Sequence, residues 1–363
     1  MATITLPDLR RYAIARSLFT PTTLPKAIER LGFVQADPIR SPARAQDLTL
    51  RQRVKGYRAG DLERRYPQMA VEEDFFVNYG FVTPELHARM HPRTARSEWP
   101  AERWAQAQAV WHYVQARGEA HPREVDAHFA HGHTTNGFGG RSKASTQLLD
   151  AMHYRGLLRV ARRDNGIRLY AAHTPREAPE SVTEVLDQLV DVLVNKYAPL
   201  PLPGLRQLVA MLKHAVPQWQ DQLRAALQRA VQRLPHAEVD GVAWYWPQGE
   251  DPHSRRWRAP EGVRLLAPFD PVVWDRDRFE RLWAWAYRFE AYTPPAKRVR
   301  GYYAMPLLWH DQVIGWGNLS VVGGRLQADI GYVGGQAPSD TSYRSALATE
   351  LAGMAACLGT EQH

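Results

Sequence analysis

The stretch GLLRVARRDNGIRLY, residues 156–170, decides the fold class. Residues 157–161 and 167–170 are short runs of mainly apolar residues, which is typical of β-strands. Between them, Asn165 and Gly166 form a dipeptide that strongly favours a tight two-residue turn. We therefore predict a β-hairpin whose connection is residues 162–166.

Three helices are predicted before this hairpin. Apolar residues recur at helical spacing from Trp104 to Val114, and Gly118 follows as a helix end. Further helices are expected over residues 122–129 and 142–155. Three helices followed by a hairpin is the element order of a winged helix.

The same order recurs more loosely in residues 182–246. We expect helices over 182–196, 205–214 and 218–233, and then a second wing over 239–246. The length of this segment is near that of the preceding module, which favours a tandem arrangement.

The two ends of the chain differ from this pattern. Residues 6–90 alternate helical patterns with an extended stretch at 33–38. Beyond Gly262 the sequence is rich in aromatic and β-branched residues with glycine turns, which predicts strands over 302–309, 312–322 and 325–332. A last helix is expected over 342–357.

We therefore predict an α+β chain of tandem winged-helix domains followed by a small β-rich, barrel-like domain. Its 363 residues exceed the usual size of one hydrophobic core. The predicted boundaries are 1–95 for an N-terminal winged-helix-like domain, 96–175 for a winged helix, 176–260 for a third such domain and 261–363 for the β-rich domain with its helix.

Composition narrows the class of protein. With 44% hydrophobic residues the chain is not intrinsically disordered. It carries 46 Lys and Arg against 38 Asp and Glu, and Arg greatly outnumbers Lys, which suits contacts with phosphates or base edges. Cys357 is the only cysteine, so neither an intramolecular disulfide nor a cysteine-built zinc site can form. We find no signal peptide or membrane-spanning stretch and expect a soluble, cytoplasmic, monomeric protein.

Basic and polar residues gather on the first predicted winged helix. Helix 142–155 would begin with donors for phosphates and base edges, namely Arg141, Ser142, Lys143, Ser145, Thr146 and Gln147. The hairpin would add Arg159, Arg162, Arg163 and Arg168. These residues predict nucleic-acid binding, and the alternative is a protein-binding module with a solvated basic face.

A carboxylate and an amide stand close together in Gln35-Ala36-Asp37-Pro38. The residue before a proline prefers an extended conformation, and residues two apart in such a segment point to the same side. Gln35 and Asp37 would therefore share one face. The alternative is that Asp37 caps a helix that begins with Pro38.

A metal site is not expected. Four histidines cluster in the sequence, but their spacing does not match a metal triad and no carboxylate stands at ligand spacing beside them: His121, His128, His131 and His133.

Several stretches together resemble the winged-helix DNA glycosylase family of the AlkZ and YcaQ (AlkX) type. The first is Leu31-Gly32-Phe33-Val34-Gln35-Ala36-Asp37-Pro38-Ile39, followed by Arg44-Ala45-Gln46-Asp47. The module at residues 139–170 is similar as well, as are residues 266–276 (LAPFDPVVWDR) and 287–298 (YRFEAYTPPAKR). The resemblance covers nearly the whole chain. One difference is Asn78, which stands where some relatives have histidine.

The resemblance implies a function and a site. A tandem winged-helix array closed by a small β-barrel would hold double-stranded DNA that contains alkylated or crosslinked purines. The enzyme would hydrolyse the N-glycosidic bond of N7-alkylated purines and unhook interstrand crosslinks in the bacterial nucleoid. Gln35 and Asp37 match the catalytic pair, and no metal or organic cofactor is implied.

The residue types fit this chemistry. A purine alkylated at N7 is already a good leaving group, so the enzyme must stabilise a cationic sugar and deliver water. Asp37 would do both, while Gln35 would hold the water. A DNA-binding transcription regulator without activity is the alternative.

Further DNA contacts are expected on both sides of this pair. Arg40 and Arg44 would grip flanking phosphates, and a basic, aromatic element would add Lys297, Arg298 and Arg300 beside Tyr302 and Tyr303. Strand packing is the alternative for the two tyrosines. We expect the tryptophans nearby to be core residues, namely Trp274, Trp283 and Trp285.

Overall fold

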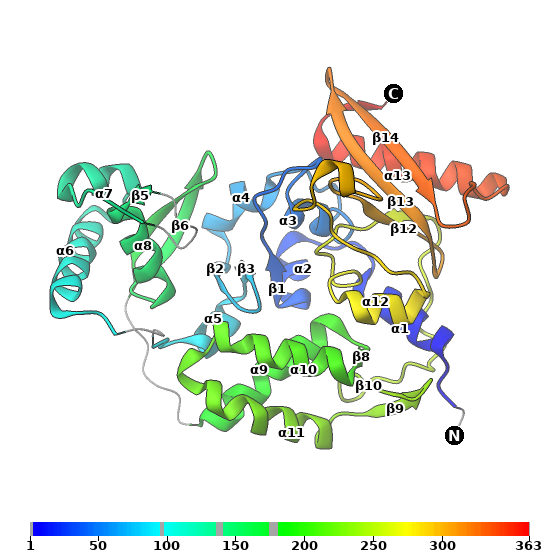
Figure 1. The fold of residues 1–363 in the computed structure, drawn as a ribbon, viewed down its shortest axis with the longest axis horizontal. Coiled ribbons are helices and arrows are strands. Elements are labelled where there is room, and N and C mark those ends of the chain that lie inside the picture. Colours follow the sequence, from blue (N-terminus) through cyan, green and yellow to red (C-terminus); the bar gives the residue numbers. More distant parts are fainter. Residues whose placement is uncertain (1–2, 95–97, 136–140, 174–180, 363) are drawn as a thin grey trace. The chain divides into compact units, whose positions relative to one another are not determined.

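The computed structural model describes residues 3–94, 98–135, 141–173 and 181–362 (Figure 1). In these residues the fold is a mixture of helices and strands, and the chain divides into two compact units. The first unit consists of Met1–Leu62, Val190–Val209 and Leu227–His363. The second unit consists of Glu63–Leu189 and Ala210–Ala226.

The second unit contains the predicted three helices and hairpin. The helices are α6 (Ala101–Arg117), α7 (Pro122–Phe129) and α8 (Ala144–Tyr154), and the hairpin pairs β6 (Leu158–Asp164) with β7 (Ile167–Ala172). Asn165 and Gly166 have φ angles of 49° and 84°, as a tight primed turn requires. The element order is confirmed, and the winged-helix arrangement stays a prediction.

One helix begins later than predicted. Residues 141–143 form strand β5 (Arg141–Lys143), which pairs antiparallel with β4 (His133–Thr135), so they are not the first turn of the helix over 142–155. The extended backbone of Lys143 then leads into α8. The expectation that Arg141, Ser142 and Lys143 project from a helix start is therefore wrong.

The remaining elements of the second unit precede and follow this module. Strands β2 (Glu72–Phe75) and β3 (Tyr79–Val82) form an antiparallel hairpin that leads into α5 (Pro84–Met90). The short elements are the 3-10 helices η1 (Tyr66–Gln68), η2 (Leu212–His214) and η3 (Pro217–Gln222).

The first unit begins with α1 (Leu6–Ser17), α2 (Leu24–Leu31), β1 (Phe33–Gln35) and α3 (Ala45–Leu50). Strand β10 (Val242–Tyr245) pairs antiparallel with both β8 (Leu200–Pro201) and β9 (His236–Val239). Four helices have residues in both units: α4 (Asp61–Arg65), α9 (Val182–Tyr197), α10 (Leu202–Met211) and α11 (Leu223–Arg233). The four predicted domain boundaries stay a prediction.

The β-rich end of the chain forms a half-barrel sheet. Its strands run in the order β11 (Val263–Leu265), β12 (Met305–Trp309), β13 (Gln312–Val322), β14 (Arg325–Tyr332) and β15 (Glu361–Gln362). The bounds predicted for β13 and β14 are confirmed. Strand β12 begins at Met305, later than predicted, because residues 302–304 form a turn and a loop. The 3-10 helix η4 (Pro295–Lys297) lies before them. Helix α12 (Arg276–Trp283) lies between β11 and β12 in sequence.

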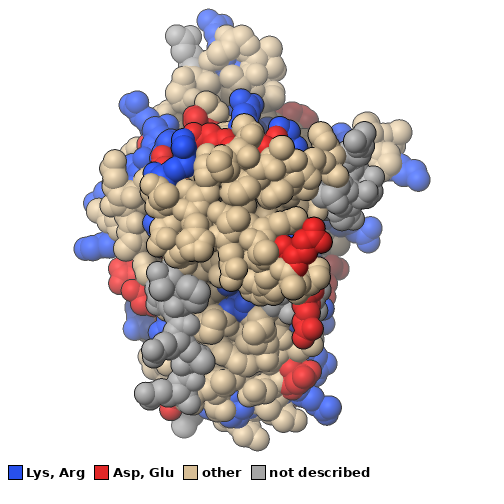
Figure 2. Space-filling view, turned by 90° about the vertical axis from the view of Figure 1, so that its left-hand side faces the viewer, with Lys and Arg blue, Asp and Glu red and all other residues tan. Residues whose placement is uncertain are grey.

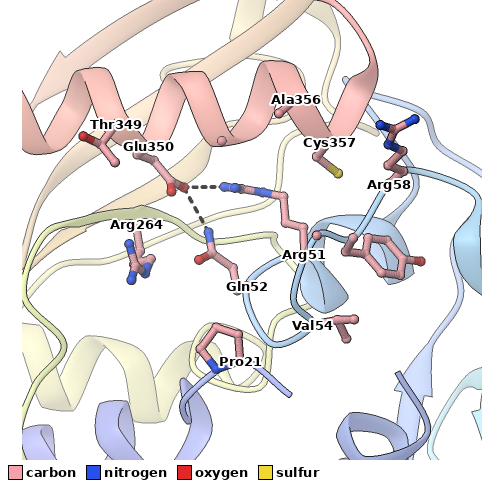
Figure 3. Close-up of a pocket in the computed structure, with 13 residues that line it drawn as sticks. Pro21, Arg51, Gln52, Val54, Arg58, Arg264, Thr349, Glu350, Ala356 and Cys357 are labelled. Atoms are coloured by element: carbon pink, nitrogen blue, oxygen red, sulfur yellow. Dashed lines mark hydrogen bonds and ion pairs between the residues drawn. The ribbon is translucent and has the colours of Figure 1, made fainter. Parts of the chain in front are cut away.

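Helix α13 (Thr341–Leu358) packs against this half-barrel (Figure 1). The buried Glu350 carboxylate accepts hydrogen bonds from Arg51 and from Gln52, the latter at 2.9 Å (Figure 3). It also accepts the Leu265 N–H at 2.7 Å. These contacts fasten the half-barrel to the segment after α3. The hollow of about 480 Å³ beside them contains neither Gln35 nor Asp37 in its lining.

Candidate active site

Strand β1 is held firmly at the position where the Gln-x-Asp sequence begins. Gly32 ends α2 with a φ of 65°, and a Cβ atom there would lie 3.1 Å from the Val192 side chain. Next to it, the buried ammonium of Lys196 donates a hydrogen bond to the Phe33 carbonyl. Burial lowers the pKa of Lys196 to about 7. The backbone that carries Gln35 is therefore fixed from α9.

The side chain of Gln35 is oriented by a tryptophan. The indole N–H of Trp274 donates a hydrogen bond to Gln35 Oε1, at 2.9 Å. Because an indole nitrogen can only donate, this contact turns the amide oxygen of Gln35 toward Trp274 and its NH₂ group away from Trp274. The Trp274 contact thus sets the orientation of the Gln35 amide.

Trp274 corrects one of the sequence predictions. Trp283 and Trp285 are buried, as predicted, but Trp274 is only half-buried because its indole serves the Gln35 amide. Its ring packs against that of Tyr197, with centroids 5.2 Å apart. The contact joins residues 239 positions apart. No sequence pattern around Trp274 predicts that it would contact Gln35.

Asp37 is half-buried and lightly bound. Its Oδ1 accepts a hydrogen bond from the Ile39 N–H at 2.9 Å, and its own N–H donates to Gln46 Oε1 at 3.3 Å. Burial raises the pKa of Asp37, and the Ile39 hydrogen bond opposes that rise. The alternative that Asp37 caps a helix is wrong, because the next helix begins at Ala45.

A buried ion-pair frame supports Trp274. Arg53 donates to both carboxylate oxygens of Asp270, at 2.7 and 3.0 Å, and both side chains are fully buried. Asp275 caps α12 through the Arg278 N–H at 3.0 Å. The LAPFDPVVWDR stretch therefore acts as scaffold, with Trp274 as the residue that reaches the amide.

A tightly held loop lies before β12. The carboxylate of Glu290 accepts hydrogen bonds from three successive backbone N–H groups, those of Val299, Arg300 and Gly301, at 2.8 to 3.1 Å. Asn318 Nδ2 donates to the Arg300 carbonyl at 2.7 Å. Loop 298–303 is therefore fixed in shape, and with Ser41 it lines a hollow of about 650 Å³.

The basic residues of this loop have different environments. Lys297 is exposed, the Arg298 guanidinium stacks over the Tyr302 ring at 5.0 Å, and Arg300 lies over Trp285 at 4.7 Å. Tyr302 is 41% exposed whereas Tyr303 is buried. Tyr303 therefore packs in the core of the half-barrel, as a residue of the turn before β12 and not of a strand.

The loop after Asp37 carries the two arginines expected to contact phosphates. Arg40 is exposed and forms no ion pair with the residues that the structure describes. Arg44 is half-buried and directly precedes α3. Both lie within a few residues of Asp37 on the same connection.

The arginines of the β6–β7 hairpin are largely neutralised by acidic partners. The Arg163 side chain is mostly buried and pairs with Glu73 at 2.6 Å, whereas Arg162 is more exposed and pairs with Glu119 at 2.6 Å. Arg159 and Arg168 are likewise paired, with Glu72 and Asp150. Arg163 is therefore a structural contact, not a solvent-facing one.

The residues at the start of α8 include one more neutralised cation. Lys143 pairs with Asp126, and Thr146 is half-buried on α8. The side chains of Arg141 and Ser142 lie outside the described residues. Figure 2, which views the side where α6 and α7 lie in Figure 1, shows a largely uncharged face whose Lys and Arg lie mainly toward its edges, some beside Asp or Glu.

One buried group has the donor atoms of a metal site but not the charge. Asp74, His87 and His91 have ligand atoms within 4.8 Å of one another. However, Arg93 donates to both carboxylate oxygens of Asp74, at 2.8 and 3.1 Å, and His91 Nε2 lies 2.7 Å from Asp74 Oδ2. A metal ion would meet the guanidinium charge, so this group is an ion-pair cluster. Of the four clustered histidines, His121 caps α7.

Comparison with known proteins identifies the family of this chain. A family model described as DNA glycosylase AlkZ-like matches residues 28–357. The chain therefore belongs to the AlkZ-like DNA glycosylase family, a class of DNA-repair enzymes that cleave N-glycosidic bonds, and the resemblance seen in the sequence is confirmed.

A solved structure shares the fold. The chain is similar to the Streptomyces sahachiroi DNA glycosylase AlkZ, with a TM-score of 0.66 and 13% sequence identity. The match covers 99% of this chain and 98% of that one. Among the described helices, we find none with the length and apolar character needed to cross a bilayer.

Proposed function

We propose that this enzyme hydrolyses the N-glycosidic bond of N7-alkylated purines in double-stranded DNA and unhooks interstrand crosslinks made through such purines. Asp37 and Gln35 are the catalytic residues of this proposal. The observation that carries it is the Trp274 hydrogen bond, which fixes the Gln35 amide two residues from a lightly bound carboxylate.

The reaction assigns one task to each side chain. The bond between the sugar C1′ and the purine nitrogen breaks, and its electrons leave with the base, which N7 alkylation had made cationic. The Asp37 carboxylate stabilises the cationic sugar and accepts a proton from water, whose oxygen bonds to C1′. The products are a free, neutral base and an abasic site.

The orientation of the amide gives Gln35 a defined role. Its oxygen accepts the Trp274 indole N–H, and we assign to its NH₂ group a hydrogen bond to the oxygen of the attacking water. The same water donates to Asp37. This arrangement aims a lone pair of the water at the sugar without a metal or organic cofactor.

We assign contacts with duplex DNA within each unit by itself. In the first unit we assign phosphate contacts to Arg40 and Arg44 beside the catalytic pair, and to Lys297, Arg298 and Arg300. In the second unit, the residues with this role are Arg141, Ser142, Lys143, Thr146 and Arg162. We expect a monomer in the bacterial cytoplasm, associated with the nucleoid.

The experiment is a product assay. Duplex DNA carrying one N7-methylguanine is incubated with the enzyme, and free base and abasic sites are measured together. We expect both in equal amounts, and DNA with an N7-linked interstrand crosslink should be separated into single strands after unhooking. Binding of the duplex without either product would contradict the proposal and would favour the non-catalytic alternative, which family membership already disfavours.

A further inference from the structure

A buried hydroxyl group near the catalytic pair has no visible task. Tyr303 is 2% exposed, and its ring packs edge-on against Phe289 with centroids 5.4 Å apart. Its hydroxyl is shielded from solvent and forms no hydrogen bond with the residues that the structure describes. An unpaired buried hydroxyl is costly, so one found beside a reactive group has to be explained.

Asp37 offers the matching partner. One of its carboxylate oxygens accepts the Ile39 N–H, and the other has no hydrogen bond within the described part of the chain. Ile39 packs against the hydrophobic cluster that contains Tyr303, and Tyr303 and Ser41 line the same hollow. Ile39, whose N–H group binds Asp37, is thus packed against the same hydrophobic cluster as Tyr303.

The electrostatics agree with this placement. Burial raises the pKa of Tyr303, and the charge of Asp37 is the next largest cause, which raises it further. Tyr287, Arg276 and Tyr302 are the other ionisable groups that act on Tyr303. The hydroxyl therefore stays protonated at neutral pH and can act as a donor toward a carboxylate.

We propose that Tyr303 is a positioning residue, whose hydroxyl has no hydrogen bond in this structure and donates one to the free carboxylate oxygen of Asp37 when substrate is bound. The bond would keep the carboxylate ionised in its half-buried place and hold it in one orientation for the attacking water. This inference rests on the proposed function of Asp37. It adds to the active site a residue from the hydrophobic core of the half-barrel.

The test is the pH profile of a Tyr303→Phe variant, measured as single-turnover release of N7-methylguanine. Loss of the donor should raise the pKa of Asp37, so the acid limb should move up by about one pH unit. The rate on that limb should fall about tenfold, with a smaller loss at high pH. A structural role would not move the limb.

Tyr343→Phe is the matched control. Tyr343 belongs to the same buried cluster, but its hydroxyl bonds to the Tyr332 hydroxyl at 3.0 Å. This variant should keep the wild-type pH profile, and circular dichroism should show that both variants fold. If the Tyr303→Phe profile matches that of Tyr343→Phe, the proposal is overturned.

A second comparison separates this inference from the proposed function. In an Asp37→Asn background, Tyr303→Phe should cause almost no further loss, because the acceptor charge is already gone. If Asp37→Asn is fully active, the proposed function fails. If Asp37→Asn is inactive but Tyr303→Phe leaves the acid limb in place, only the role of Tyr303 fails.

Discussion

Two aspartates, Asp74 and Asp37, have opposite surroundings. Asp74, in the second unit, is completely buried and bound by Arg93 and His91, and these groups hold its pKa far below the usual range despite burial. Asp37, in the first unit, has one backbone donor, and burial raises its pKa. From this difference we infer that the Asp74 carboxylate serves the fold, whereas the Asp37 oxygen without a hydrogen bond is available for the proposed chemistry.

The largest expected effect comes from removing the arginine that pairs with Asp74. Arg93→Ala leaves the Asp74 carboxylate buried without its cation, which should lower the free energy of unfolding by roughly 3–5 kcal/mol. Urea unfolding followed by circular dichroism measures this change. Arg117→Ala removes an ion pair that is about half exposed and screened by solvent, so its effect on stability should be far smaller. Equal losses in the two variants would show that Asp74 does not depend on Arg93.

The next effect concerns the orientation of Gln35. Trp274→Phe keeps an aromatic ring but removes the indole donor, so the amide is free to turn and the excision rate should fall about tenfold. Gln35→Ala should have a similar effect, milder than loss of the Asp37 charge. Trp283→Phe removes an indole that donates to the Asp311 carbonyl at 2.8 Å, and it serves as the control. An unchanged rate in Trp274→Phe would show that the orientation of the Gln35 amide does not contribute to catalysis.

A smaller effect separates cleavage from crosslink access. Replacing Lys297, Arg298 and Arg300 by Ala should slow crosslink unhooking several-fold more than removal of N7-methylguanine. A crosslink tethers both strands, so more of the deformation energy depends on contacts outside the lesion. Single-turnover rates on the two substrates at one salt concentration test this. Equal factors would show a general DNA grip, and no loss would show a structural loop.

The smallest effect concerns one phosphate contact. Arg40 is exposed, without an ion pair among the described residues, so Arg40→Ala should reduce the slope of log K against log salt by about one. Fluorescence anisotropy with a short duplex measures the slope. Arg162→Ala tests the neutralised hairpin in the same way, since its charge is shared with Glu119. A larger change for Arg162 than for Arg40 would place the DNA mainly on the hairpin.

Local structure was predictable wherever a short pattern determines it. The Asn165-Gly166 turn and the aromatic and β-branched residues of β13 and β14 are local signals, and the structure confirms the elements they predict. Strand β5 was missed because Arg141-Ser142-Lys143 has no apolar face, and its partner β4 is equally polar. Local patterning cannot identify a strand that is defined only by its pairing.

Polar contacts between distant residues could not be predicted at all. Arg53 meets Asp270 across 217 residues, and Trp274 meets Gln35 across 239. Neither pair has a periodic signal. For the same reason, the basic charge of the hairpin was overestimated, because Glu73 lies 90 residues from Arg163. The sequence alone identifies the Gln-x-Asp motif, but it does not predict the Trp274 contact that orients Gln35.

The most direct test of the account compares activity and stability in one variant, Asp37→Asn. Because burial raises the pKa of Asp37, its ionisation at neutral pH opposes folding, so the variant should be as stable as the wild type or slightly more stable. Excision of N7-methylguanine should fall roughly a hundredfold or more, with duplex affinity retained. Near-normal turnover by the folded variant would contradict the assignment of Asp37 as the catalytic carboxylate.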